Sequence, residues 1–286
     1  MQGSIYLPTA RLVAGLIALS SSAASAATFP ADSAFVPLHC GGNVMTDGFA
    51  DDPAFLKDRD LVGDGNAPTG LRAADAQFLY LRIRLDADPA PGGSVHAFSW
   101  GMEFDLDGDR TTYELLILAE GIAGAAGSVS VFTNHTTTLA NDPNDPADLP
   151  AAATFTFAAN ARSISTSTTN GGTPDFFIDL AIPWTALTPL GLDRDTRIHV
   201  WAGSSSTANS LDGDLACHGG GGGAPQLDGT ASDPTTGDPA RDPATGGGGG
   251  EVRLEGGGGC DAGGGTLGVA VALALRGLRR RRLRGA

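Results

Sequence analysis

Alternating apolar and polar positions between residues 98 and 120 predict two β-strands joined by an acidic turn. Every second residue of the first arm is large and apolar, and a period of two places such residues on one face: Phe98, Trp100, Met102 and Phe104. The second arm, residues 113–118, is apolar on both faces, which is typical of a strand inside a sheet. We therefore expect this hairpin at the centre of an antiparallel β-sandwich.

Other short segments rich in β-branched and aromatic residues predict further strands. They cover residues 78–85, 128–132, 154–157, 162–168, 175–182 and 197–202. In the first of them, four core-facing positions, Leu79, Leu81, Ile83 and Leu85, alternate with Phe78, Tyr80, Arg82 and Arg84. A short helical turn is expected at 184–187, and no long amphipathic helix is predicted. The fold class is therefore all-β, a jelly-roll-like antiparallel β-sandwich over residues 27–218.

The two ends of the chain differ from this body. Residues 1–26 combine Arg11, an apolar run at 12–19 and small residues at 24–26, which predicts a secretory signal peptide and export. Residues 219–259 hold sixteen glycines and four prolines without apolar periodicity, which predicts a disordered, flexible linker.

The last segment, residues 260–286, has a cysteine, a short apolar run and an arginine cluster in that order. Cys260 follows a glycine run, residues 266–275 are apolar, and six arginines lie within 276–284. This order resembles the MYXO-CTERM sorting signal of myxobacterial surface proteins, with a short hydrophobic sorting helix. The resemblance implies cleavage and lipid attachment at Cys260 and a lipoprotein displayed on the outer membrane. The run is short against the ~20 residues of a permanent membrane span.

The body is strongly acidic. The whole chain has a formal charge of −14, and residues 27–260 contain 11 Lys and Arg against 31 Asp and Glu, which gives −20. A surface of this sign excludes electrostatic binding of nucleic acid or of anionic membranes. It is compatible with divalent cations, neutral glycans and cationic partners.

Aspartates recur in the turn at 105–109, where Asp105, Asp107 and Asp109 alternate with Leu106 and Gly108. Carboxylate oxygens are the ligands that calcium prefers, so these three residues are the candidate metal ligands. Glu114, or an aspartate from residues 47–64, could complete the site. The alternative is a plain acidic turn, because Asp is also a common turn residue.

The cysteines allow two interpretations. If Cys260 is the processing site, Cys40 and Cys217 remain near the two ends of the body, and in an exported domain they predict a disulfide. A zinc site that adds His39 and His218 is the alternative, although adjacent residues of an extended chain point apart.

The body resembles the β-sandwich shared by family 9 carbohydrate-binding modules and DOMON-like domains. The resemblance rests on Asp47-Gly48 near the start, residues 78–83, the turn at 104–109 and above all residues 177–187. It supports the fold more than a function. From the residues themselves, Trp201 is the candidate for stacking on a sugar ring, since it shares a face with Arg197 and His199 opposite the core set. The alternative for Trp201 is a rim or core role. Tyr80 and Arg82 complete the candidate ligand-binding set.

These observations predict a surface-displayed, non-catalytic binding module for carbohydrate or extracellular matrix. The alternative is a structural or adhesive surface protein with calcium-stiffened loops and no small ligand. A hydrolase is the third class, since glycosidases need two carboxylates across a cleft. Glu103 and Glu114 are the pair available, but neighbours in a hairpin seldom frame a cleft.

Overall fold

The computed structural model describes residues 26–40, 43–48, 56–108, 112–139 and 145–216. The chain divides into two units, residues 1–247 and 248–286, and all described residues belong to the first. The predicted linker and sorting segment, and the signal peptide up to residue 25, therefore lie outside the described residues.

One antiparallel sheet has five strands in the order β1–β4–β5–β11–β10. Its strands are β1 (Val36–Pro37), β4 (Gly70–Ala74), β5 (Phe78–Leu85), β11 (Phe176–Pro183) and β10 (Ala161–Ser165). The predicted strand 78–85 matches β5 at both ends. β5 and β11 pair along their full length, with Arg82 opposite Asp179 and Ile83 opposite Ile178.

The second antiparallel sheet has six strands in the order β13–β12–β6–β7–β8–β9. Its strands are β13 (Asp214–Ala216), β12 (His199–Ser205), β6 (Ser99–Asp105), β7 (Leu115–Glu120), β8 (Ser128–Thr133) and β9 (Ala153–Thr156). The predicted hairpin forms the two central strands, β6 and β7, which pair directly. The expectation that its second arm lies inside a sheet is confirmed.

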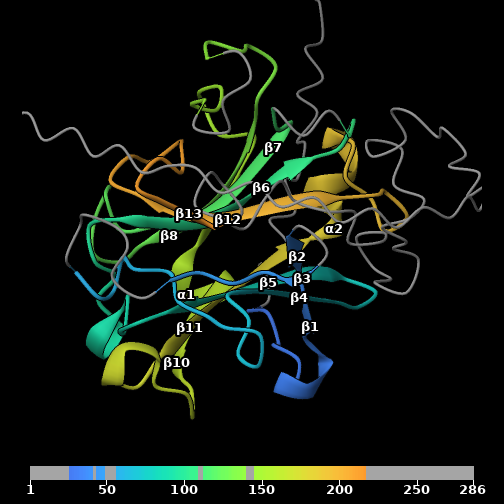
Figure 1. Ribbon diagram of the computed structural model, residues 1–286. Helices are drawn as coiled ribbons and strands as arrows, with labels where there is room; N and C mark the ends of the chain where they lie inside the picture. The colour runs from blue at the N-terminus through green and yellow to red at the C-terminus, as the bar shows by residue number, and fades with distance from the viewer. Residues whose placement is uncertain (1–25, 41–42, 49–55, 109–111, 140–144, 217–286) are drawn as a thin grey trace, which may run out of the picture. The chain divides into compact units, whose positions relative to one another are not determined.

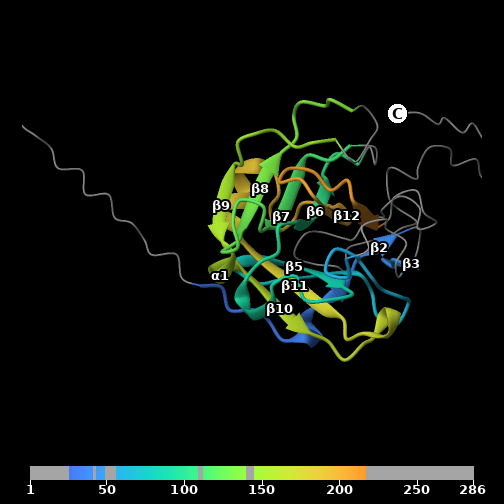
Figure 2. The same ribbon diagram turned by 90° about the vertical axis from the view of Figure 1, so that its left-hand side faces the viewer.

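Apolar side chains of both sheets form one hydrophobic core. The inward residues of β5, such as Leu81, belong to the same buried cluster as Trp100 of β6 and Ile117 of β7. The two views show the sheets as separate layers, with β6, β7, β8 and β12 above β5, β10 and β11 (Figures 1 and 2). The prediction of an all-β, antiparallel fold is confirmed for the described part of the chain.

Short elements complete the described fold. A two-stranded sheet pairs β2 (His39–Cys40) with β3 (Asn43–Val44). The helices are one turn each: α1 (Phe157–Asn160), and α2 (Trp184–Leu187), which was expected because Pro183 ends β11. β4 was not predicted from the sequence. Its residues Gly-Leu-Arg-Ala-Ala have little strand propensity, but both β1 and β5 pair with it.

Candidate metal centre

The acidic turn connects the two central strands of the six-stranded sheet. β6 ends at Asp105, and Gly108 has a φ of +85°, a left-handed conformation that glycine adopts without a steric penalty. The Gly108 backbone N–H donates to Asp105 Oδ1 at 2.6 Å. This hydrogen bond closes the turn and fixes the Asp105 carboxylate at the end of the strand.

Three carboxylates meet at this turn. One oxygen each of Asp105, Asp107 and Glu114 lies within 4.8 Å of the other two. Asp105 is buried, Glu114 half-buried and Asp107 exposed, so the group opens toward solvent on one side. Glu114 is held in place by the backbone N–H of Leu106, which donates to Glu114 Oε2 at 2.6 Å. Among the residues that the structure describes, this is the group of acidic side chains close enough to share an ion.

The spacing fits a hard cation. Calcium binds oxygen at roughly 2.3–2.6 Å, so two ligands of one ion lie up to about 5 Å apart. Three carboxylates bring three negative charges together, and a divalent cation offsets their repulsion. His199 lies next to this group, with Nδ1 3.6 Å from Asp105 Oδ2. The residues present could thus hold a metal ion, and oxygen ligands favour calcium, magnesium or manganese over softer metals.

Two of the three predicted metal ligands belong to this group. Asp105 and Asp107 do come together, and Glu114 is the residue that completes the group. Asp109 lies outside the described residues. The described aspartates of 47–64 are engaged elsewhere: Asp58 Oδ2 lies 2.8 Å from His96 Nδ1, and the backbone N–H groups of Asn66 and Ala67 lower the pKa of Asp64.

The expected sugar-stacking face is not formed by Trp201. Its side chain is 2% exposed and belongs to the hydrophobic core. Trp201 lies opposite Glu103 on β6, and Glu103 lies opposite Leu116 on β7. All three side chains are buried, so this face of the sheet is also covered. His199 is buried on the same face, and Arg197, which precedes β12, is exposed. The prediction missed this because an alternating strand does not reveal that both of its faces are buried.

Tyr80 and Arg82 lie in the other sheet and are buried as well. They contact the chain's own N-terminal segment rather than solvent. Tyr80 Oη lies 3.0 Å from the carbonyl oxygen of Thr28, and Arg82 Nη1 lies 2.9 Å from Asp32 Oδ1. The five candidate ligand residues are therefore divided between two sheets and do not form one site.

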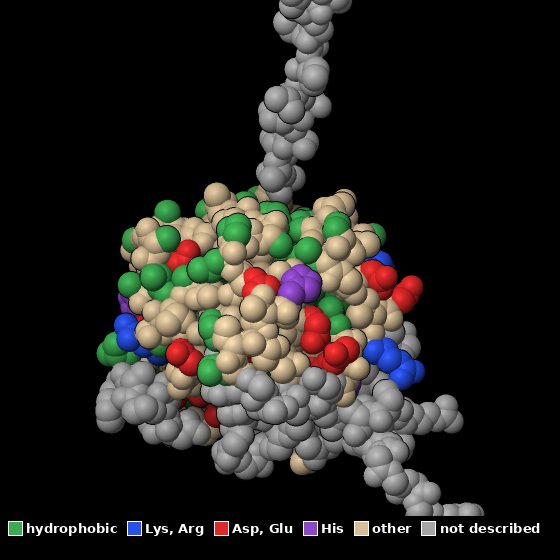
Figure 3. Space-filling model, turned by 90° about the horizontal axis from the view of Figure 1, so that it is seen from above, with side chains coloured by type: hydrophobic (Ala, Val, Ile, Leu, Met, Phe, Trp, Pro, Cys, Tyr) green, Lys and Arg blue, Asp and Glu red, His purple; other side chains and the backbone are tan. Residues whose placement is uncertain are grey.

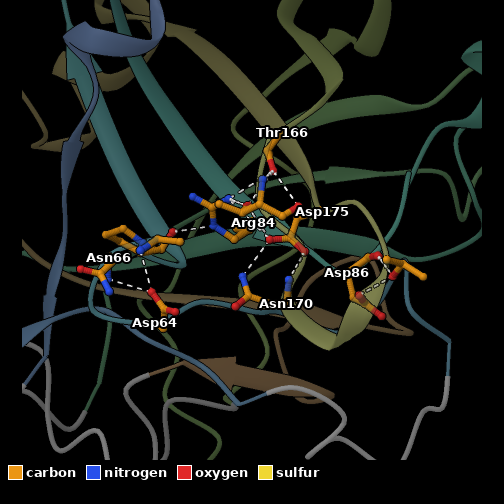
Figure 4. A network of polar contacts seen from close by, with 11 residues as sticks. Asp64, Asn66, Arg84, Asp86, Thr166, Asn170 and Asp175 are labelled. Carbon is orange, nitrogen blue, oxygen red and sulfur yellow. Dashed lines mark hydrogen bonds and ion pairs between the residues drawn. The ribbon is translucent and has the colours of Figure 1, made fainter.

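A polar network at one end of the five-stranded sheet centres on Arg84 (Figure 4). Its Nε donates to the carbonyl oxygen of Pro68 at 3.1 Å, and its Nη1 lies 3.6 Å from Asp175 Oδ2. Asp175 also accepts hydrogen bonds from the backbone N–H and the side-chain amide of Asn170 at 2.8 and 2.7 Å. The network connects β5 to the loops before β4 and before β11, which gives it a structural role.

The surface seen from above, over the six-stranded sheet, is built mainly from uncharged polar groups and backbone, with carboxylates scattered over it (Figure 3). Apolar side chains are interspersed rather than gathered in one patch. This described face offers neither a broad basic surface nor a continuous aromatic platform.

Cys40 is disulfide-bonded. Its predicted partner Cys217 lies outside the described residues, as do Cys260 and the alternative zinc ligand His218. In the part of the chain that the structure describes, no helix is long and apolar enough to cross a membrane.

Comparisons with known proteins find no protein similar to this chain. No family model matches the chain. Searches of the curated proteins and of the solved structures find no match either.

Proposed function

We propose that this protein is an exported, non-catalytic module of the cell surface, whose acidic hairpin is stiffened by a calcium ion. The observation that carries the proposal is the convergence of Asp105, Asp107 and Glu114 within 4.8 Å at the tip of the two central strands. An ion held there links the end of β6 to the start of β7. Such a link stabilises the hairpin in proportion to the occupancy of the site.

The display of the module is proposed from the two ends of the sequence. The secretory signal at 1–26 supplies export, and the linker at 219–259 separates the domain from the cell. The segment beginning at Cys260, with its similarity to the MYXO-CTERM signal, anchors the mature protein in the outer membrane as a lipoprotein. The two-layered body fits the jelly-roll-like β-sandwich that we propose for it.

Between the two non-catalytic functions, burial favours the structural or adhesive one. Stacking on a sugar ring needs an accessible aromatic face, whereas Trp201, the candidate for it, is packed in the core. A hydrolase is disfavoured because Glu103, one of its two candidate carboxylates, is fully buried. We therefore propose an adhesive or structural role first, and carbohydrate or matrix recognition through exposed loops second.

A calcium titration tests the proposal. The exported chain is titrated by calorimetry and by thermal unfolding in chelator and in millimolar calcium. Calcium at about one hundred times its Kd should stabilise the fold by about 2.7 kcal/mol. Asp107→Asn should abolish the response, while Asp195→Asn, an exposed turn aspartate outside the group, should not. No calcium response in the parent would reject the proposal.

A glycan array separates the two candidate functions. The parent chain is applied with calcium and with chelator. Calcium-dependent binding to a defined glycan would favour recognition, whereas calcium stabilisation without glycan binding would favour the structural role.

A further inference from the structure

The N-terminal segment of the body crosses the outer face of the five-stranded sheet. We call residues 27–35 the strap; it begins immediately after the predicted signal peptide. Figures 1 and 2 show it as the blue segment on the side of this sheet away from the six-stranded one. Pairing with the sheet begins only at Val36, which lies opposite Arg72.

Arg82 is the centre of the surface beneath the strap. Its guanidinium lies between two rings, 3.8 Å from the centroid of Phe35 and 4.4 Å from that of Phe177. Two of its N–H groups donate to Asp179 at 2.6 and 2.8 Å, and Nη1 meets the strap residue Asp32 at 2.9 Å. Because Asp179 is in the sheet, Arg82 is already oriented before the strap arrives.

A second contact point holds the start of the strap. The ring of Phe29 lies 5.9 Å from that of Tyr80, and the guanidinium of Arg162 lies 4.5 Å from the Phe29 centroid. Arg162 Nε also donates to Asp179 at 2.8 Å. One buried carboxylate thus orients both arginines that contact the strap.

The spacing of the strap residues matches these contact points. Phe29, Asp32 and Phe35 recur at intervals of three, and residues Asp32–Ala34 form a 3₁₀ turn. A 3₁₀ helix has three residues per turn, so residues i and i+3 lie on the same side. Asp32 and Phe35 therefore reach the same guanidinium.

The strap is held weakly compared with the core. Its apolar contacts, with Tyr80, Ala73 and Ala181, form a cluster separate from the main hydrophobic core. The Asp32 side chain is 75% exposed, so water screens its pair with the buried Arg82. Within the described residues, the backbone hydrogen bond that joins the strap to the rest of the chain runs from Ala27 N–H to the carbonyl oxygen of Ala159 at 2.8 Å.

We propose that the outer face of β5 and β11 is a peptide-binding surface, and that the strap is its intramolecular occupant. The strap opens without unfolding the core. The opened surface accepts a segment that forms the same 3₁₀ turn and carries an aromatic, an acidic and an aromatic residue at intervals of three. Arg82 and Arg162 supply the cationic contacts, and Tyr80 and Phe177 supply the rings.

The test uses the exported chain and a fluorescent peptide with the sequence of residues 27–37. A strap variant, Asp32→Asn with Phe35→Ala, vacates the surface and leaves the sheet residues unchanged. If the strap is closed in about nine of ten molecules, the apparent affinity of a competing peptide is about tenfold lower than its affinity for the open surface. The variant should therefore bind the peptide at least about tenfold more tightly than the parent. A control peptide carrying the same two substitutions should bind neither.

Amide hydrogen exchange in the parent gives a second readout that does not depend on the variant. The amides of Ala34 and Phe35 are hydrogen-bonded within the strap, and that of Leu116 lies in central strand β7. Local opening predicts exchange at least about a hundredfold faster in the strap than at Leu116. Equal protection would overturn the proposal, as would equal or absent peptide binding by parent and variant. A parent dimer that the peptide dissociates would assign the surface to a second copy's strap and overturn the intramolecular assignment.

Discussion

Glu114 accepts a hydrogen bond from the backbone N–H of Leu106 at 2.6 Å, across the acidic turn. Its own backbone N–H donates to the carbonyl oxygen of Phe104 at 2.9 Å. The backbone of the hairpin therefore places this carboxylate beside Asp105 and Asp107. A candidate site that is already organised loses less conformational freedom when an ion binds.

Glu114→Gln separates the structural role of this side chain from its role as a ligand. The amide oxygen can still accept from Leu106, but one negative charge is removed. In chelator, we expect a melting temperature equal to or above that of the parent, because repulsion among the carboxylates falls. In millimolar calcium, we expect the variant to lose the stabilisation by the ion that the parent shows. Thermal unfolding with and without chelator measures both effects.

Glu114→Ala is the matched control for the hydrogen bond. It removes the acceptor as well as the charge, so it should cost about 1 kcal/mol in chelator relative to Glu114→Gln. If Glu114→Gln retained the full calcium response, Glu114 would not be a ligand.

Asp179 should dominate the stability of the five-stranded sheet. It is fully buried and pairs with both Arg82 and Arg162. Asp179→Ala leaves the buried Arg82 with only the exposed Asp32 as a carboxylate partner, and the loss of a buried partner typically costs about 3–5 kcal/mol. Asp32→Asn removes only the exposed pair with Arg82 and should cost less than about 1 kcal/mol. Denaturant unfolding of the two variants checks the contrast, and similar losses would contradict it.

The sequence predicted the central strands well because their pattern is dictated by burial. β5 and β6 alternate large apolar residues over eight and seven positions, a pattern typical of strands. β7 is apolar on both faces, which is typical of a strand inside a sheet. β4 was missed because tertiary pairing, rather than propensity, makes it a strand. The polar face of β5 was predicted, but its contact with residues 27–35 depends on a long-range approach that no local pattern encodes.

The candidate site was predicted only as far as its local residues. Asp105 and Asp107 are two positions apart in one turn, so their proximity follows from the sequence. Glu114 joins them because the hairpin register brings the second arm back beside the first. Of the two roles considered for Trp201, its burial fits the core role rather than sugar stacking, because its strand is covered on both faces.

Alkaline titration should show that both tyrosines of the mature body are protected. Once residues 1–26 are removed, Tyr80 and Tyr113 are the tyrosines that remain. Burial and the neighbouring Asp75 raise the pKa of Tyr80. Burial and the charges of Glu103, Asp145 and Asp148 raise the pKa of Tyr113. Each raised pKa stabilises the fold fully below the unfolded value of about 10, and the contribution is lost as the pH rises toward the folded value.

Ultraviolet absorbance of tyrosinate measures this directly. The folded chain should show no ionisation near pH 10, and both tyrosines should ionise together when the chain unfolds at higher pH. In guanidinium both should titrate near pH 10. A midpoint near 10 with native circular dichroism would show that at least one ring is accessible, and Tyr80→Phe would identify which.

We expect two of the three cysteines to form a disulfide and the third to be the processing site. Cys40 is disulfide-bonded, and β13 ends at Ala216, directly before Cys217. We expect non-reducing peptide mapping of exported protein to find Cys40 linked to Cys217. Cys217→Ala should then destabilise the domain by about 2–5 kcal/mol, because the bond closes a long loop of the unfolded chain.

Cys260→Ala should leave the melting temperature unchanged, since a glycine-rich linker separates it from the domain. It should nevertheless retain the arginine-rich tail and reduce surface display, because the processing site is lost. A Cys40–Cys260 linkage, or mature surface protein with peptides beyond Cys260, would refute this assignment.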